Sequence, residues 1–282
     1  MTKKLRHSAG SSVGWIAAGI ILFFVLVALF APLLAPYGEN EQNLIMRLKP
    51  PVWADGGSDA HLLGTDELGR DVLTRLVYGA RASIAVGVLT VVVSGMIGIV
   101  MGLFSGYFPK LDAVLMRIAD VQLAFPSMLL ALALIAVIGG GFLQLIMVLG
   151  ISGWVSFARV IRSETLSIKS ADYVMAAQTA GVRTPRILLR HIFPNILAPA
   201  VTIGTFQVAS SIISEASLSF LGLGIPPTTA TWGNMLQSGK MFISSAWWLA
   251  LLPGLCIVLI VLSINIMGDV LRDYTDPHIK AK

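Results

Sequence analysis

The feature that most constrains the fold is a series of six long apolar segments. They cover residues 15–34, 83–108, 113–138, 142–160, 196–221 and 246–270. Each is at least about as long as the roughly 20 residues that an α-helix needs to cross the hydrocarbon core of a bilayer. With 56% hydrophobic and only 12% charged residues, the chain is too apolar for a typical soluble domain. The sequence therefore predicts an all-α membrane protein with six transmembrane helices.

The connections between these segments predict how the helices are oriented. Cytoplasmic connections of membrane proteins carry an excess of Lys and Arg. With a cytoplasmic N-terminus, more than twice as many Lys and Arg fall on the cytoplasmic side as on the outer side. We therefore expect both termini in the cytoplasm, as tails at residues 1–14 and 271–282. The same bias explains the net charge of +5, so we expect no nucleic acid partner.

The lengths of the connections divide the chain into parts. The segment 15–34 is too long for the apolar region of a cleaved signal peptide and is interpreted as a retained first helix. An external loop at 35–82 then leads to a five-helix core at 83–270, which includes a cytoplasmic connection at 161–195. Connections this long commonly carry function. Within the core, Gly95, Gly98 and Gly102 fit close helix packing, although glycine is frequent in membrane helices generally.

Several classes of site are not expected. Cys256 is the only cysteine, so neither a disulfide framework nor a cysteine-based metal site is predicted. The four histidines, His7, His61, His191 and His278, are dispersed along the chain, which makes a metal cluster improbable. Residues 233–240 end in Gly-Lys but do not have the spacing of a phosphate-binding loop. We therefore expect no catalytic residue, metal ligand or nucleotide site in this chain.

The cytoplasmic connection predicts two short helices. Ser170 can cap the first helix, Asp172 lies in its first turn, and Gly181 can supply the left-handed residue that ends it. Its alanines form a slim face that suits docking into a groove of another protein, or the helix is an amphipathic tether at the lipid surface. On residue chemistry alone, both interpretations stay open.

The second short helix has its own residues that mark its beginning and its end. Thr184 can provide its N-cap and Pro185 its first helical position. Pro194 is then expected to bend the chain back toward the membrane.

The external loop predicts an amphipathic helix before the second crossing. Thr65 or Asp66 can cap this helix. Asp66 with Arg70, and Asp71 with Arg75, are acid–base pairs four residues apart, each worth about 0.2–0.5 kcal/mol on a helix. A solvated helix at the membrane surface and a functional segment are equally compatible with this pattern.

Three motifs resemble one family of transport proteins. Ala176-Ala177, Gly181 and the ending His-Ile-Phe-Pro-Asn at 191–195 resemble the signature cytoplasmic loop of permeases of ATP-binding-cassette (ABC) importers. Residues 63–71, Leu-Gly-Thr-Asp-Glu-Leu-Gly-Arg-Asp, resemble a segment of the dipeptide, oligopeptide and nickel permease group, and residues 217–224 fit as well. The long outer segment resembles the second permease of that group. Met175 is a departure, because the family often has Glu at this position.

The resemblance implies the permease fold of type I ABC importers and a set of partners. A second homologous permease would complete a heterodimer in the cytoplasmic (inner) membrane of a bacterium, in contact with membrane lipid. Two ATP-binding subunits would hold ATP and Mg²⁺, and an external substrate-binding protein would deliver the substrate. Dipeptides or oligopeptides are the implied substrates, with glutathione or a nickel chelate as alternatives.

The resemblance also assigns roles to individual residues. Coupling to the ATPase is implied for Asp172, Tyr173, Ala176, Ala177, Ala180 and Gly181. Support of the coupling loop is implied for Thr184, Pro185, His191, Pro194 and Asn195. The external-loop motif comprises Gly64, Thr65, Asp66, Gly69, Arg70 and Asp71.

Glu215 is the ionisable residue that lies deepest within a predicted crossing. Such residues are costly in a membrane and are functional hypotheses by default. Glu215 can line the transport pathway, or it can be a hydrogen-bond partner between helices that holds the two permeases together. Rival classes of protein are an ion-coupled secondary transporter and a membrane-embedded enzyme, but neither the ion ligands of the first nor the catalytic set of the second is found.

Overall fold

The computed structural model describes the backbone of residues 2–275 and the side chains of residues 12–274. The tails predicted at 1–14 and 271–282 therefore lie partly outside the described residues, as do the side chain of His7 and all of His278. Within residues 2–275 the structure is helical, and its only extended pairing is an isolated bridge between Thr65 and Asp71. The predicted all-α fold is confirmed.

The helices differ widely in length. In chain order they are α1 (Thr2–Leu29), α2 (Ala31–Leu34), η1 (Leu44–Met46), α3 (Val72–Tyr107), α4 (Pro109–Leu123), α5 (Ser127–Ile138), α6 (Phe142–Lys169), α7 (Asp172–Thr179), α8 (Thr184–Ile187), η2 (Leu188–Ile192), α9 (Phe193–Phe220), α10 (Trp232–Gly239), η3 (Lys240–Phe242) and α11 (Trp248–Thr275). Among the described residues, α1, α3, α6, the continuous stretch from α8 to α9, and α11 are long and apolar enough to cross a membrane. They account for five of the six predicted crossings.

The third predicted crossing, at residues 113–138, is not one continuous helix. It is divided into α4 and α5, whose axes differ by 88°. The break falls at Pro126, which cannot donate a backbone hydrogen bond and disfavours helical geometry in the residue before it. The predicted crossing at 113–138 is therefore a bent pair of helices, which forms the sixth span if both halves are counted together.

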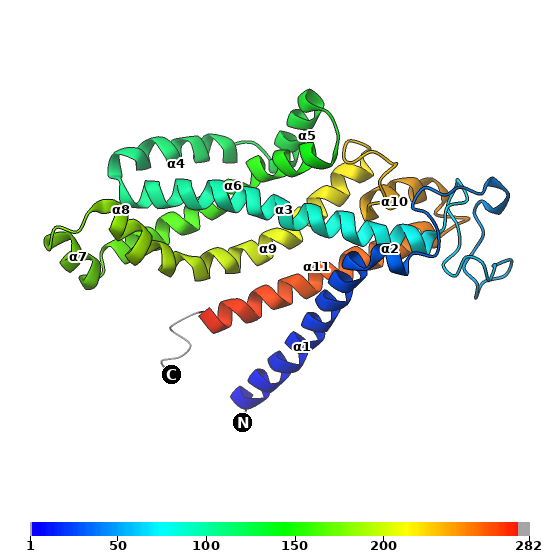
Figure 1. Cartoon of the computed structure of the whole chain (residues 1–282), viewed down its shortest axis with the longest axis horizontal. Helices are drawn as coiled ribbons and strands as arrows, with labels where there is room; N and C mark the ends of the chain where they lie inside the picture. The colour runs from blue at the N-terminus through cyan, green and yellow to red at the C-terminus, as the bar shows by residue number, and fades with distance from the viewer. Residues whose placement is uncertain (1, 276–282) are drawn as a thin grey trace.

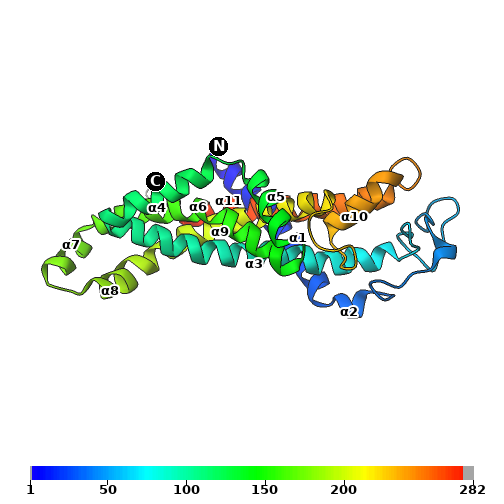
Figure 2. The same cartoon turned by 90° about the horizontal axis from the view of Figure 1, so that it is seen from above.

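The centre of the molecule is the pair α3 and α6, which lie side by side with α9 (Figures 1 and 2). Gly98, Gly102 and Gly106 are spaced four residues apart, so they share one face of α3. A β-carbon added at Gly102 would lie 2.6 Å from the carbonyl oxygen of Ala158 in α6. Because glycine allows helix backbones to approach this closely, the predicted close packing is confirmed at Gly98 and Gly102.

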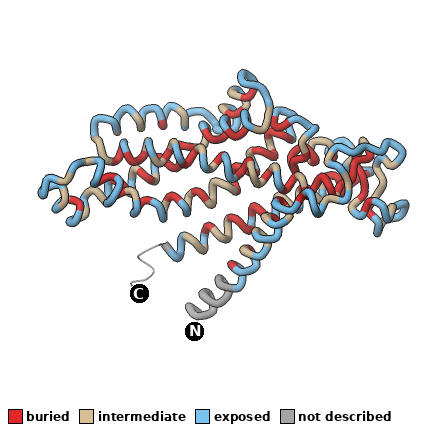
Figure 3. Tube along the Cα trace, in the orientation of Figure 1, coloured by how far each residue is buried: buried red, intermediate tan, exposed pale blue. Residues whose placement is uncertain are grey.

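The two ends of the long axis carry different elements. Helices α7 and α8 lie at one end, and the loop at 35–71 lies with α10 at the other (Figure 1). The start of α1 and the end of α11 point toward the α7 end (Figure 1). Buried residues follow the facing sides of α3, α6 and α9 and continue into the loop end, while much of α4 and α5 is exposed (Figure 3). The exposed surface includes many large apolar side chains, as expected for contact with lipid or with another protein.

Candidate functional site

Helix α7 is a short helix that follows α6 at one end of the molecule. Its N-cap is Ala171, which offers no side-chain hydrogen bond. Ser170 still belongs to the end of α6, and its hydroxyl donates to the carbonyl of Ser167 at 2.8 Å. The prediction that Ser170 caps the short helix was therefore wrong, because α6 extends up to Lys169.

The end of α7 is a left-handed glycine, as predicted. Gly181 has φ +77°, a conformation that side chains disfavour. Its N–H donates to the carbonyl of Gln178 at 3.0 Å, and the N–H of Val182 donates to that of Ala177 at 3.1 Å. These bonds satisfy carbonyls at the end of the helix and turn the chain sharply.

One face of α7 is packed and the opposite face is free. Val174 is fully buried in an apolar cluster that includes Ile187 and Ile192. At 100° per residue, Asp172 and Ala176 lie opposite Val174. The exposed residues of α7 and its C-cap are Asp172, Tyr173, Met175, Ala176, Gln178, Thr179 and Ala180, whereas Ala177 is half-buried. The slim face therefore consists of Ala176 and Ala180, with Ala177 at its edge.

The residues expected to support α7 meet it in space. The side-chain amide of Asn195 donates to the carbonyl of His191 at 2.6 Å and lies 3.5 Å from the hydroxyl of Tyr173. The rings of Tyr173 and His191 are 6.3 Å apart. Asn195 thus links the first turn of α9 to α7.

The capping residue and the prolines of this region take other positions in the helices than predicted. Thr184 is the first helical residue of α8, with Arg183 as N-cap and Pro185 in the first turn. Helical hydrogen bonding then continues through the π-helical turn η2 into α9, so Pro194 does not end the helix. The wider turn places Pro194 in the first turn of α9, where its missing N–H is tolerated.

An ion pair that sequence reasoning missed fixes the end of α6 that carries α7. The guanidinium of Arg162 donates to both carboxylate oxygens of Asp112 in α4, at 2.5 and 2.6 Å. Ser105 in α3 donates to the same carboxylate at 2.5 Å. Lys169 Nζ donates to the carbonyl of Tyr107 at 2.8 Å. The partners come from different helices, so no local spacing in the sequence indicates them.

At the opposite end, the loop motif (residues 64–71) is a tight turn and not a helix. Asp66 Oδ1 accepts hydrogen bonds from the N–H groups of Leu68 and Arg70, both at 2.9 Å. Helix α3 begins only at Val72, and its N-cap is Asp71, which accepts from the N–H of Thr74 at 2.7 Å. The prediction that Thr65 or Asp66 caps the helix was therefore wrong by several residues.

The charges of the loop motif are buried and paired. Arg70 Nε donates to Asp66 Oδ2 at 2.7 Å, as predicted. Asp71 does not pair with Arg75, because its Oδ1 lies 3.0 Å from Nδ1 of His61. Arg75 Nε instead lies 3.6 Å from Asp66. All of these side chains are at most 9% exposed, which contradicts a solvated surface helix.

The loop at 35–71 is fastened to the start of α11 and to the chain between α9 and α10. The indole N–H of Trp248 donates to the carbonyl of Thr65 at 3.2 Å. Glu39 accepts from the N–H of Ala230 at 2.5 Å, and the side-chain amide of Asn40 donates to the carbonyl of Thr228 at 2.7 Å. The loop is therefore held in place by hydrogen bonds and forms an integral part of this end of the molecule.

Glu215 lies inside the helix packing of this chain. It is 0% exposed and accepts hydrogen bonds from the hydroxyls of Ser83 in α3, at 3.1 Å, and Ser219 in α9, at 2.8 Å. The N–H of Trp232 donates to the Ser83 hydroxyl at 3.3 Å, which ties in α10. In this conformation the carboxylate joins helices of one chain and is turned toward no open surface.

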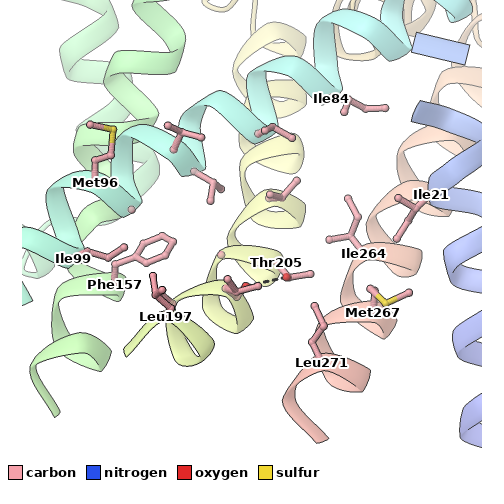
Figure 4. A pocket seen from close by; sticks show the side chains of 18 of the residues that line it. Ile21, Ile84, Met96, Ile99, Phe157, Leu197, Thr205, Ile264, Met267 and Leu271 are labelled. Carbon is pink, nitrogen blue, oxygen red and sulfur yellow. Dashed lines mark hydrogen bonds between the residues drawn. The ribbon is translucent and has the colours of Figure 1, made fainter. Parts of the chain in front are cut away.

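A groove of about 630 Å³ lies between α1, α3, α9 and α11 (Figure 4). Its lining includes Ile21, Ile84, Phe157 and Met267. Among the described residues that line it, Thr205 is the only one with a hydroxyl, and that hydroxyl donates to the carbonyl of Val201 at 3.0 Å. The groove thus offers no charged group to a polar ligand.

Comparison with known proteins gives consistent matches along the chain. The family described as binding-protein-dependent transport system inner membrane component matches residues 94–281, and the N-terminal transmembrane domain of oligopeptide transport permease C matches residues 11–51. The chain is 44% identical to the di/tripeptide transport system permease protein DppC of Pseudomonas aeruginosa (strain UCBPP-PA14), covering 94% of this chain and 88% of that protein. It is also 44% identical to the dipeptide transport system permease protein DppC of Escherichia coli (strain K12), covering 98% and 91%.

A likeness of fold is also found among solved structures. A chain of the MetNI methionine ABC transporter in an inward-facing conformation matches with a TM-score of 0.58 and 17% identity. The match covers 72% of this chain and 96% of that chain.

Proposed function

Because the chain belongs to the family of binding-protein-dependent transport system inner membrane components, we propose that it is the second permease of a bacterial importer of dipeptides or oligopeptides. Its fold is that of the type I ABC importer permeases. As a multi-pass permease of this class it works with ATP-hydrolysing and substrate-binding partners. The finer assignment to peptides rests on the names of its relatives, which are dipeptide or di/tripeptide permeases.

The observation that carries the mechanism is the geometry of α7. This helix has one buried anchor, Val174, and an opposite face on which Ala176 and Ala180 offer small side chains beside the exposed Asp172. Such a face suits close docking into a cleft of an ATPase subunit, the role that the motif implies. The exposed apolar side chains of Tyr173 and Met175 flank it and would be covered by such a partner.

The contacts of α7 with neighbouring helices would let it act as a lever. Val174 packs against α8 and η2, and Asn195 links Tyr173 to α9. The Arg162–Asp112 pair holds the preceding helix to α4. When ATP draws the ATPase subunits together, a displacement of α7 would therefore move α6 and α9 with it, and the permease would switch between inward-facing and outward-facing states.

The same proposal specifies the surroundings of the chain. Both termini and α7 would lie in the cytoplasm, and the loop at 35–71 would face the substrate-binding protein outside the inner membrane. A second, homologous permease would complete the pathway. ATP and Mg²⁺ would be bound by the two ATPase subunits.

Replacing Ala176 by Leu tests the docking role. Overpacking a close contact typically costs about 1–3 kcal/mol, so ATPase retained on the purified permease should fall by roughly tenfold. Peptide uptake should fall with it, while the amount of permease in the membrane stays the same. Ser244, exposed at the opposite end, provides the control substitution Ser244→Leu. Normal ATPase binding and normal uptake in the Ala176→Leu variant would refute the proposal.

The substrate class has a separate test. Proteoliposomes with the complete transporter should accumulate a labelled dipeptide when ATP is supplied, and an excess of unlabelled dipeptide should compete. Competition by a nickel chelate or by glutathione, but not by dipeptides, would assign the chain to a different substrate while leaving the docking role intact.

A further inference from the structure

A very small cavity lies where the loop motif meets α3, α10 and α11. Its lining residues are Asp66, Glu67, Val72, Arg75, Met235, Ser238 and Leu249. The space inside is about 10 Å³. A water molecule needs about 10–15 Å³ of such space, so the cavity is at the lower limit for one water and too small for anything bigger.

Two of the lining residues each have a side-chain atom that is buried without a hydrogen-bond partner in the described part of the protein. These atoms are Oε2 of Glu67 and Nη1 of Arg75. The side chain of Arg75 is only 3% exposed and that of Glu67 is 21% exposed. The other carboxylate oxygen of Glu67 accepts from Arg70 at 3.2 Å, so the Glu67 side chain is already held in place. A buried charged group with an unused hydrogen-bonding atom is costly, which makes a further ligand favourable.

The chemistry of these two atoms selects the ligand. A carboxylate oxygen only accepts hydrogen bonds, and a guanidinium nitrogen only donates them. A ligand that serves both must donate to one and accept from the other. Water does both, whereas a halide only accepts and an ammonium ion only donates. The two carboxylates of Asp66 and Glu67 are balanced by the guanidinium groups of Arg70 and Arg75, so the cluster has no net charge to attract an ion.

We propose that a single structural water molecule occupies this cavity and bridges Glu67 Oε2 and Arg75 Nη1. Ser238 lines the same cavity, and its hydroxyl would provide a third partner. Buried waters typically make about three hydrogen bonds to such groups. The water joins the loop motif to the first turn of α3 and, through Ser238, to α10.

The direct test is a density map of the complete transporter in lipid nanodiscs, at a resolution that shows buried waters elsewhere. A peak within about 3.2 Å of both Glu67 Oε2 and Arg75 Nη1 is expected. The hydroxyls of Thr90 and Thr165 are also buried without a hydrogen-bond partner, but these residues do not line this cavity. They serve as internal controls for the peak. A map with ordered waters at other buried sites and no peak here would overturn the proposal.

A pair of variants at Ser238 gives a second test. Ser238→Ala keeps room for the water, whereas Ser238→Val directs a methyl group into the cavity and displaces it. The apparent melting temperature of the Val variant should be lower than that of the Ala variant by about 5 °C or more, since two charged groups lose their bridge. The lower helix propensity of Val by itself gives a smaller difference in melting temperature between the two variants. A difference no larger than that would overturn the proposal.

Discussion

Replacing Gly102 by Ala tests whether the close contact of α3 and α6 holds the fold together. A β-carbon at this position would lie 2.6 Å from the carbonyl oxygen of Ala158 and 2.8 Å from Cβ of Ile161. Ordinary contacts of a β-carbon begin at 3.4 Å, so these two distances are too short by about 0.8 Å and 0.6 Å. The first neighbour is a backbone atom and the second is a β-carbon, so neither can rotate away. The helices themselves must separate.

The expected cost follows from this overlap. Overpacking a well-packed interior by one methyl group typically costs about 1–3 kcal/mol. Ala also has a higher helix propensity than Gly, by up to about 1 kcal/mol, which would mask part of the loss. Gly19 in α1 separates the two effects, because a β-carbon added there has nothing within 4 Å. The difference between Gly102→Ala and Gly19→Ala should therefore give the packing cost alone, about 1–3 kcal/mol.

The measurement is the free energy of unfolding of the purified protein in detergent micelles, from titration with a denaturing detergent. Gly102→Ala is expected to unfold at a lower denaturant concentration than Gly19→Ala. Equal free energies of unfolding for the two variants would mean that α3 and α6 adjust to the methyl group freely. The reasoning that glycine is required at this contact would then be refuted.

Three further substitutions have expected outcomes. Asp71→Ala removes the N-cap of α3 and a partner of His61, and should lower the free energy of unfolding by about 0.5–2 kcal/mol, whereas Asp71→Asn, which also caps, should lose less. Glu215→Leu removes the acceptor of two buried hydroxyls and should reduce the folded protein recovered from membranes below that of Glu215→Gln; equal recovery would contradict the structural role. Arg162→Met removes the charged partner of Asp112 and leaves only the bond from Ser105, so it should speed amide hydrogen exchange in α4 through the loss of about 1 kcal/mol for a partly exposed pair; unchanged exchange would be the contrary result.

Much of the architecture follows from local properties of the sequence. Apolar runs of spanning length located five of the six crossings, because transfer into a bilayer depends on the composition of about 20 consecutive residues. Gly181 was predicted to end the short helix and does so with φ +77°. The Asp66–Arg70 pair was also predicted, since four residues separate its members. The motifs placed the chain in its family, whereas the roles they imply for α7 stay predictions.

The tertiary structure alone decided how distant residues combine. The crossing at 113–138 is bent at Pro126, although its two helices together are apolar enough for one span. Asp71 pairs with His61 although Arg75 is nearer in the sequence. Arg162 pairs with Asp112 on another helix. The sequence left both a pathway role and a role in helix packing open for Glu215, and only the positions of Ser83 and Ser219 place its carboxylate between helices of one chain. The physical reason is that hydropathy and helix termination depend on neighbours along the chain, whereas ion pairs and buried hydrogen bonds depend on which helix faces meet.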